Sequence, residues 1–272
     1  MAASFFAPVN LVAVVGDDFT EEDASIFSGR NINLDGLERV DGARSFFWSG
    51  EYGYDLNVAT TRDTQLNVFA GFQPRLDQTQ RTAEVLFLAN AEPGLQMDVL
   101  RQCVRPRLVA LDTMNLWIAT AKSGLTDVFR EVDLVIVNEA EVRQYTGEPN
   151  LVKGARQILS LGPRTLVIKR GEYGVLMVTA DAIFAAPAYP LEAVFDPTGA
   201  GDTFAGGFLG YLASRQEFHE REMRRAVIFG SVLASFTVEK FSLDRLREIT
   251  LADVQERYQD FRALTHFDDW DR

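Results

Sequence analysis

Residues 196–204 read Asp-Pro-Thr-Gly-Ala-Gly-Asp-Thr-Phe, and this stretch governs how the rest of the chain is interpreted. Pro197 prevents a helix from running into the stretch, and the glycines allow backbone N–H groups to turn inward where a side chain would clash. The residues that follow, 203–213, have the composition of a helix that packs closely through Gly206, Gly207 and Gly210. A Gly-Ala-Gly turn at a helix N-terminus presents unpaired N–H donors and the positive end of the helix dipole, so it suits a polyphosphate.

The turn ends in a carboxylate, Asp202. A carboxylate beside bound phosphates is electrostatically unfavourable, so its presence there indicates a base that takes a proton from a hydroxyl group. The alternative interpretation is an ordinary helix start, because aspartate is a common N-cap residue.

The stretch resembles, almost residue for residue, the signature D-T-x-G-A-G-D-x-F of the ribokinase-like (PfkB) carbohydrate kinases. The resemblance implies that Asp202 is the catalytic base and that Gly199, Ala200 and Gly201 form an anion hole. It also implies ATP and Mg²⁺ as cofactors, K⁺ as a further one, and a sugar or nucleoside as the small-molecule substrate.

Composition restricts the class of protein. The chain has 272 residues, of which 47% are apolar, which is enough for one sizeable core with a small appendage. Its net charge of −12 argues against a nucleic-acid surface. Cys103 is the single cysteine, so we expect neither a disulfide framework nor a cysteine metal cluster, and we expect a reducing, cytoplasmic location.

Two further compositional features exclude other classes. His219 and His266 are the two histidines and lie in polar stretches, which argues against histidine triads and histidine-rich metal sites. Neither a signal peptide nor an apolar run near the roughly 20 residues that span a bilayer is apparent, so no membrane partner is expected.

Short apolar runs alternate with helical stretches along most of the chain, which predicts a mainly parallel sheet covered on both faces. With the resemblance, the expected fold is a ribokinase-like three-layer α/β/α domain over residues 1–272. The expected strands are residues 11–15, 85–88, 108–111, 134–137 and 165–168, with a hairpin at 175–178 and 183–186. Helices are expected at 201–214, 220–237 and 251–264.

Residues from about 43 to 72 have a different pattern, in which aromatic and apolar residues alternate with polar residues and turn formers. This pattern predicts a small antiparallel sheet. Its position matches the lid of the family, which closes over substrate and in some members pairs with a second subunit, so a homodimer through the lid is expected. Its aromatic residues could stack on a base or on a sugar ring, or could simply pack.

Residues suited to ligand binding follow four successive strands, at the edge where ligands bind in an open α/β sheet. Each could instead be a turn residue or a helix cap. The residues are Asn90, Asp112, Asn115, Asn138, Glu141, Lys169 and Gly171. Their recurrence favours one shared cleft, with Asn90, Asp112 and Asn115 on the substrate.

Two of these groups match motifs of the family. Asn138-Glu139-Ala140-Glu141 resembles the N-x-x-E motif, in which Asn138 and Glu141 help to place Mg²⁺, in part through water; the alternative is a capped helix start. Residues 169–174 resemble the K-x-G-x-x-G segment that lines the nucleotide site, through Lys169, Gly171 and Gly174. The alternative there is an ordinary hairpin with glycines at positive φ.

Three weaker assignments complete the expected site. Asp196 and Thr198 lie where members of the family often place ligands of a monovalent cation, partly through backbone carbonyls, and Thr198 also lies at the nucleotide. Ser231 lies in the helix that usually borders the adenine, although an apolar helix with small residues is also typical of core packing.

The N-terminal part departs from the family pattern. The family opens with a strand, a substrate-binding aspartate and a G-G-x-x-x-N segment, whereas the one Gly-Gly pair here is Gly206-Gly207. Residues 1–8 resemble the latter half of the family's first helix, so an initial strand is expected to be absent. Either the sequence is a shortened product or the protein has lost part of its sugar site.

The residues therefore favour an ATP-dependent kinase that acts on a hydroxyl of a sugar or nucleoside. The alternative is a catalytically impaired ribokinase-fold protein that binds a nucleotide or other ligand. A nucleotide-dependent oxidoreductase is disfavoured, because no glycine fingerprint follows the first expected strand.

Overall fold

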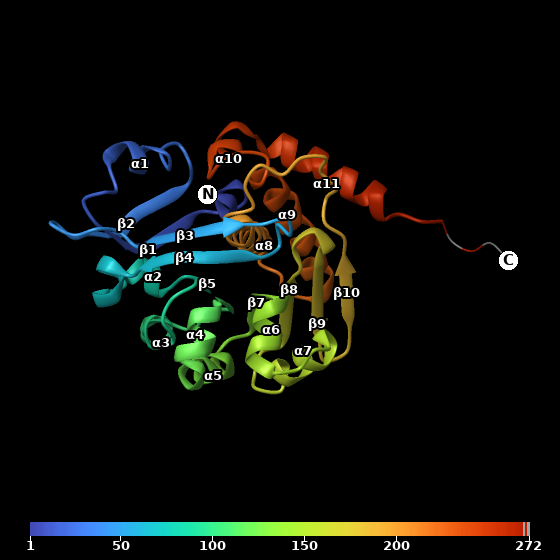
Figure 1. Ribbon diagram of the computed structural model, residues 1–272, viewed down its shortest axis with the longest axis horizontal. Coiled ribbons are helices and arrows are strands. Elements are labelled where there is room, and N and C mark those ends of the chain that lie inside the picture. The colour runs from blue at the N-terminus through green and yellow to red at the C-terminus, as the bar shows by residue number, and fades with distance from the viewer. Residues whose placement is uncertain (269, 271–272) are drawn as a thin grey trace. The chain divides into compact units, whose positions relative to one another are not determined.

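A computed structural model of the protein describes residues 1–268 and residue 270 (Figure 1). Contacts divide the chain into two compact units, which are described separately. The C-terminal unit comprises Met1–Ala7, Lys169–Met177 and Ile183–Arg272, and the N-terminal unit comprises Pro8–Ile168 and Val178–Ala182. Within residues 1–268 and 270, no helix combines the length and the apolar character needed to cross a membrane.

The strands of residues 1–268 form three sheets. The largest has the order β10-β9-β8-β7-β6-β5, and β5–β6 and β6–β7 are parallel pairs. Its strands are β5 (Val85–Leu88), β6 (Leu108–Asp112), β7 (Leu134–Asn138), β8 (Thr165–Lys169), β9 (Val175–Thr179) and β10 (Ile183–Ala186). These strands agree with the expected runs to within one residue, because each is a short apolar segment bounded by polar or turn residues.

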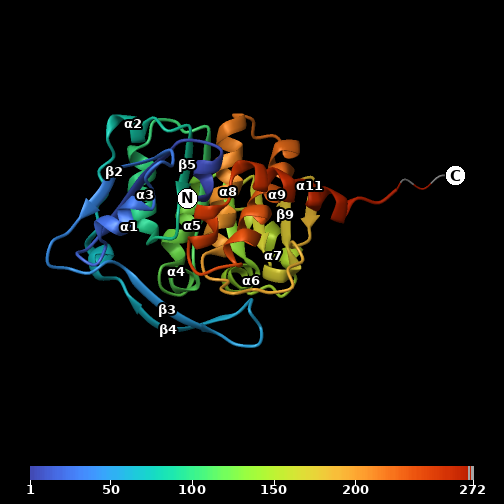
Figure 2. The same ribbon diagram turned by 90° about the horizontal axis from the view of Figure 1, so that it is seen from above.

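Two smaller sheets belong to the N-terminal unit. Strand β1 (Val9–Val15) pairs in parallel with β2 (Ile32–Arg39), and β3 (Phe47–Tyr52) pairs antiparallel with β4 (Ala59–Gln65). The β3–β4 sheet confirms the antiparallel pattern expected between residues 43 and 72, and Figure 2 shows the two strands running side by side. Strand β2 was not predicted, because its sequence Ile-Asn-Leu-Asp-Gly-Leu-Glu-Arg is half polar and contains a glycine.

The helices of the N-terminal unit are short, and β6 to β8 between them are almost wholly buried. They are α1 (Glu21–Ser25), α2 (Gln78–Arg81), α3 (Pro93–Gln102), α4 (Asn115–Thr120), α5 (Lys122–Glu131), α6 (Glu139–Thr146) and α7 (Leu151–Leu159), with a 3₁₀ turn η2 (Asn67–Gly71).

The C-terminal unit is built on two long helices, α8 (Ala200–Arg215) and α9 (Glu220–Thr237). A Cβ at Gly207 would lie 2.8 Å from Leu233 Cδ1, and one at Gly230 would lie 2.8 Å from the carbonyl oxygen of Phe204. The glycines therefore allow the two helices to pack at close range. The remaining elements are η1 (Ala2–Phe5), η3 (Gly171–Tyr173), α10 (Asp244–Glu248) and α11 (Leu251–Thr265).

The N-terminal turn η1 packs on α8. A Cβ at Gly210 would lie 2.6 Å from Ala3 Cα, and one at Gly206 would lie 3.1 Å from Ala2 Cβ. Residues 2–5 thus form a 3₁₀ turn, and Ala2 is buried.

Candidate functional site

Helix α8 begins at Gly199, which has φ +78° and lies in the left-handed region. The carbonyl oxygen of Gly199 accepts the N–H of Thr203 at 2.9 Å, which closes the first turn. A Cβ at Gly199 would meet no atom within 4 Å, so the glycine is required by its backbone angle and not by lack of space. This is the turn that the sequence predicts at the start of the helix.

The backbone donors of this turn are not equivalent. The N–H of Ala200 donates to the carbonyl of Pro197 at 3.2 Å. Within residues 1–268 and 270, the N–H groups of Gly199 and Gly201 have no hydrogen-bond partner, and no side chain caps α8. Two of the three amides expected in the anion hole are therefore available to a ligand as the turn stands, whereas that of Ala200 is engaged.

The loop before the turn is held at both sides. The carboxylate of Asp196 accepts the N–H of Thr198 at 2.9 Å, and the N–H groups of Phe195 and Asp196 both point to the carbonyl of Val238, at 2.7 and 3.3 Å. The loop is thus fixed to the end of α9. Whether Asp196 and Thr198 bind a cation remains a prediction.

Asp202 lies in the first turn of α8 and its side chain is exposed. The neighbouring Thr203 is buried, and its hydroxyl accepts a hydrogen bond from Thr237 Oγ1 at 3.0 Å. The first turn is therefore anchored on its inner side to α9, while Asp202 on its outer side is accessible.

Lys169 lies against the same turn. A Cβ at Gly201 would lie 3.1 Å from Lys169 Nζ and 3.7 Å from Lys169 Cδ and Cε. The lysine side chain therefore crosses over Gly201, in a space that any larger residue would narrow. An ammonium group, a helix N-terminus and two unpartnered amides together form a positively polarised surface that suits a phosphate group.

The segment after Lys169 is the tight turn that the sequence predicts. Gly171 has φ +54° and Gly174 has φ +83°, and the N–H of Arg170 donates to the carbonyl of Gly174 at 2.8 Å. A Cβ at Gly174 would lie 2.1 Å from the carbonyl oxygen of Ala186. Both the angle and the space therefore require glycine at position 174.

In the N-terminal unit, Asn138 and Glu141 form a reciprocal capping box at the start of α6. The N–H of Asn138 donates to Glu141 Oε2 at 2.7 Å, and the N–H of Glu141 donates to Asn138 Oδ1 at 2.8 Å. The alternative interpretation of the motif, a capped helix start, is therefore confirmed as its structural role. A role in placing Mg²⁺ remains a prediction.

The residues expected at the substrate follow β5 and β6. Asn90 accepts a hydrogen bond from Trp117 Nε1 at 3.1 Å, and its amide lies 3.1 Å from Met114 Sδ. Asp112 is 4% exposed and accepts the N–H of Thr113 at 2.8 Å. Asn115 is exposed and begins α4. The structure thus joins Asn90 to Met114 and Trp117, two residues that sequence reasoning missed.

Ser231 is buried in α9, and its hydroxyl donates to the carbonyl of Val227 at 2.9 Å. Such a bond back to the preceding turn is typical of a packed helix. A position beside adenine stays a prediction for this residue.

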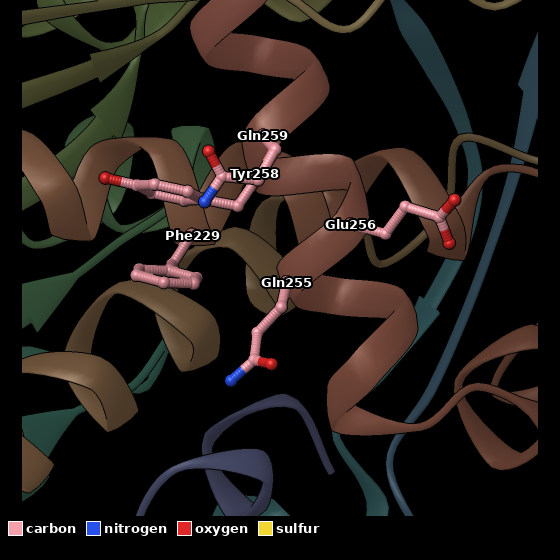
Figure 3. Close-up of a pocket in the computed structure, with 5 residues that line it drawn as sticks. All are labelled: Phe229, Gln255, Glu256, Tyr258 and Gln259. Atoms are coloured by element: carbon pink, nitrogen blue, oxygen red, sulfur yellow. The ribbon is translucent and has the colours of Figure 1, made fainter.

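A surface hollow of the C-terminal unit lies apart from these residues. It is lined by Phe229, Gln255, Glu256, Tyr258 and Gln259, and the rings of Phe229 and Tyr258 stack with centroids 4.3 Å apart (Figure 3). None of the residues predicted for the site lines this hollow. We attribute it to packing between α9 and α11.

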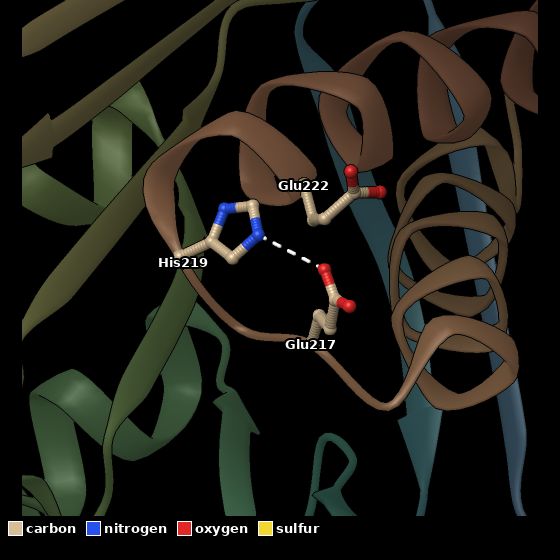
Figure 4. Close-up of side chains that lie close together, drawn as sticks. All are labelled: Glu217, His219 and Glu222. Carbon is tan, nitrogen blue, oxygen red and sulfur yellow. Dashed lines mark hydrogen bonds and ion pairs between the residues drawn. The ribbon is translucent and has the colours of Figure 1, made fainter.

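A second cluster brings together Glu217, His219 and Glu222, with His219 bonded to Glu217 at 3.0 Å (Figure 4). Glu222 is buried and already accepts hydrogen bonds from Tyr211 Oη at 2.5 Å and from Arg225 at 2.6 Å. The Tyr211 bond and the two nearby arginines, Arg225 and Arg215, hold the pKa of Glu222 below its usual value, although burial opposes them. Burial, with the Glu222 bond, raises the pKa of Tyr211 to about 12. Both carboxylate oxygens of Glu222 are therefore engaged in a structural network with Tyr211 and Arg225.

Comparison with known proteins decides the family. The profile of the pfkB family carbohydrate kinases matches residues 1–248. The chain belongs to the pfkB family of carbohydrate kinases. This pfkB-family protein is 30% identical to a cytidine kinase from Thermococcus kodakarensis over 221 residues, which are 79% of this chain and 77% of the relative. It is accordingly a phosphotransferase that acts on a hydroxyl group of a sugar or nucleoside.

Solved structures confirm the fold of this pfkB-family chain. The nucleoside kinase of Methanocaldococcus jannaschii superposes with a TM-score of 0.77 at 19% identity, over 95% of this chain and 83% of the other. A ribokinase II from E. coli, solved with ATP and Mg²⁺, superposes with a TM-score of 0.76 at 17% identity, over 95% and 85%. The expected ribokinase-like fold, with a mainly parallel sheet and a small antiparallel sheet, is thereby confirmed.

Proposed function

We propose that this pfkB-family kinase transfers the γ-phosphoryl group of ATP to a hydroxyl of a nucleoside, with Asp202 as the general base. The observation that carries the proposal is the first turn of α8. There two unpartnered amides, with the Lys169 ammonium group close to Gly201, lie next to an accessible carboxylate. The name of the cytidine kinase from Thermococcus kodakarensis favours a nucleoside over a free sugar as acceptor.

The proposed step follows from these groups. The acceptor oxygen attacks the γ-phosphorus, its proton passes to Asp202, and the bond from the γ-phosphorus to the bridging oxygen breaks to release ADP. The amides of Gly199 and Gly201 and the Lys169 ammonium group stabilise the negative charge of the transferred group. Asp196 and the Val238 carbonyl hold the loop so that the amides are oriented before the substrate binds.

Mg²⁺ fits the donors that the chain offers. The capping box uses Glu141 Oε2 and Asn138 Oδ1 as acceptors, but a carboxylate has about four lone-pair positions, so the cap does not exhaust Glu141. Hard oxygen donors of this kind suit Mg²⁺, directly or through water. When bound with the nucleotide, the ion would neutralise part of the phosphate charge.

Four further parts of the proposal concern the domain, the lid, the oligomeric state and a second cation. The chain acts as one kinase domain, and the β3–β4 hairpin serves as a lid over the acceptor. The hairpin also supplies the contact of a homodimer, because Phe46 and Phe47 at its start are 42% and 48% exposed. K⁺ binds near Asp196 and supports the reaction. Light scattering tests the dimer, and rates in K⁺ against choline test the cation.

The test of function is ADP release with ATP and Mg²⁺ across cytidine, other ribonucleosides, ribose and fructose. Release with nucleosides is the expected result. Release with sugars alone would overturn the nucleoside assignment but leave the kinase intact. Absence of release from folded, ATP-binding protein would overturn the kinase proposal in favour of a ligand-binding protein.

The base is tested in the same assay with Asp202→Asn. We expect kcat to fall by at least about 100-fold while the Kd for ATP changes little. Asp244→Asn is the matched control, because Asp244 is also exposed in the first turn of a helix, α10. Retention of most of the turnover by Asp202→Asn would remove Asp202 from the role of base.

A further inference from the structure

The end of β1 carries a Gly-Asp-Asp sequence, residues 16–18, to which the proposed reaction gives no role. Both carboxylates accept backbone N–H groups of one other segment, residues 42–45. Asp17 Oδ2 accepts the N–H of Gly42 at 2.8 Å, and Asp18 Oδ1 accepts the N–H of Ser45 at 2.7 Å. Hydrogen bonds from an amide to an ionised carboxylate are stronger than those between neutral groups.

The backbone of the same turn adds two more bonds to this segment. The N–H of Asp17 donates to the carbonyl of Ala43 at 2.9 Å, and the N–H of Gly16 donates to Ser45 Oγ at 2.9 Å. The approach is so close that a Cβ at Gly16 would lie 2.2 Å from the Ala43 carbonyl oxygen. Residues 16–18 and 42–45 are therefore held together by these hydrogen bonds, and we call the two segments together the anchor.

Both strands of the β3–β4 hairpin are connected to this anchor. Strand β3 begins two residues after Ser45, and β4 returns to Asn67 and Val68. Asn67 Nδ2 donates to the carbonyl of Ser45 at 2.8 Å, and the N–H of Val68 donates to the carbonyl of Arg44 at 3.1 Å. The entry and the exit of the hairpin are thus fixed to the same short turn.

The segment that continues from residues 16–18 is held by Arg39 at the end of β2. Arg39 donates to the carbonyl of Phe19 at 2.8 Å, its guanidinium lies 5.5 Å from the centroid of the Phe19 ring, and it pairs with Glu21 at 3.1 Å. The base of the hairpin is therefore attached to the β1–β2 sheet through side chains as well as through the chain.

Beyond its base, the hairpin has little to fix its direction. Strands β3 and β4 form a sheet of their own with two strands, and all but one of the β4 residues are exposed. Figure 2 shows the pair extending away from residues 42–45 and 67–68. The orientation of such a two-stranded ribbon is determined mainly where it is attached.

We propose that Asp17 and Asp18 are positioning residues that set the direction of the β3–β4 hairpin and thereby the affinity for the acceptor. The effect on the acceptor rests on the proposed function of the hairpin as a lid, whereas the effect on its direction does not. The Ser45 hydrogen bonds, and to a lesser extent Arg44, lower the pKa of Asp18, so this anchor stays charged at neutral pH.

Two variants separate charge from hydrogen bonding. Asp17→Ala with Asp18→Ala removes both acceptors. Asp17→Asn with Asp18→Asn retains an oxygen that can accept each N–H and is expected to rescue the effect in part. Asp35→Ala is the matched control, since Asp35 is an exposed carboxylate on β2, outside the anchor.

The direction of the hairpin is measured without reference to activity. Spin labels are placed by Leu56→Cys, beyond the end of β3, and Glu131→Cys, at the end of α5, in a chain that also carries Cys103→Ser. Pulsed electron–electron double resonance should give a narrow distance distribution for the doubly labelled parent chain and for its Asp35→Ala variant. It should give a broad distribution for the double alanine variant. An unchanged distribution in the double alanine variant would overturn the proposal.

Kinetics then test the consequence for substrate binding. The double alanine variant should raise KM for the acceptor about 10-fold, equivalent to about 1.4 kcal/mol, with less than a twofold change in the Kd for ATP. A uniform loss of kcat and of ATP binding would indicate general unfolding and contradict a positioning role. If the parent shows no turnover, the proposed function fails, yet the distance measurement still decides whether Asp17 and Asp18 direct the hairpin.

Discussion

The hydroxyl of Thr237 donates to Thr203 Oγ1 at 3.0 Å, where both side chains are buried, at 2% and 6% exposure. This bond joins the last turn of α9 to the first turn of α8, directly behind Asp202. It therefore couples the stability of the C-terminal unit to the placement of the proposed base.

Thr237→Val should destabilise the protein, because it leaves the buried Thr203 hydroxyl without its donor. The expected loss is about 1–3 kcal/mol of unfolding free energy, measured by urea denaturation. The double variant Thr203→Val with Thr237→Val should lose less than the sum of the single variants, because both polar groups are removed together. Additive losses would show that the two hydroxyls do not depend on each other.

The two glycines of the α8 turn should respond differently to alanine. Gly199→Ala places a side chain at φ +78° in open space, so it should lower stability by about 1–2 kcal/mol. Gly201→Ala has no such angle but brings a methyl group within 3.1 Å of Lys169 Nζ, so it should leave stability nearly unchanged and weaken ATP binding. Thermal unfolding and ATP titration of the two variants separate these effects. Equal behaviour would contradict the assignment of Lys169 to the turn.

The capping box allows the structural and the proposed metal roles of Glu141 to be separated. Asn138→Ala should cost about 1 kcal/mol of stability, because the first turn of α6 loses its cap. Glu141→Gln keeps an acceptor for the Asn138 N–H and should change stability by much less. If Glu141 helps to place Mg²⁺, the same variant should raise the Mg²⁺ concentration needed for half-maximal rate. An unchanged Mg²⁺ dependence would leave Glu141 with a capping role alone.

The Tyr211–Glu222 pair should make stability depend on pH at both extremes. The pKa of Glu222 is lower in the folded protein than in the unfolded chain, so its contribution is present above the unfolded value and is lost as pH falls through the folded one. The pKa of Tyr211 is raised to about 12, so its contribution is present below the ordinary value of 10 and is lost as pH rises toward 12. Tyr211→Phe should reduce the alkaline loss, to which the raised pKa values of Tyr258 and Tyr189 also contribute, and should leave a residual acid loss. Unfolding curves from pH 3 to pH 12 provide the measurement, and an alkaline loss as large in Tyr211→Phe as in the parent would contradict the assignment.

Much of the fold could be predicted from the sequence, because strands such as Val85–Leu88 and helices such as Glu220–Thr237 are marked by local apolar periodicity. Strand β2 could not be predicted in this way. Its partner is β1, and its polar residues face solvent, so the pairing and not the local sequence makes it a strand.

Residues of the candidate site could be predicted from the sequence where the backbone conformation requires a particular residue type. Gly199 and Gly174 are required by positive φ, and such positions can be recognised from the glycines themselves. The contact of Lys169 with Gly201 and the bond of Trp117 to Asn90 join residues far apart in the chain. The local sequence around Lys169 or Trp117 does not indicate which residue it contacts.

The seat of the η1 turn on Gly206 and Gly210 has a consequence for synthesis. Ala2 and Ala3 are synthesised before the surface that receives them, which belongs to a helix made about two hundred residues later. Contacts between such distant segments form slowly, because the entropy cost of closing a long loop precedes the free energy that the contacts contribute. The C-terminal unit therefore cannot be completed during translation of the first half of the chain. The residues of η1 can pack in place only after α8 has been synthesised.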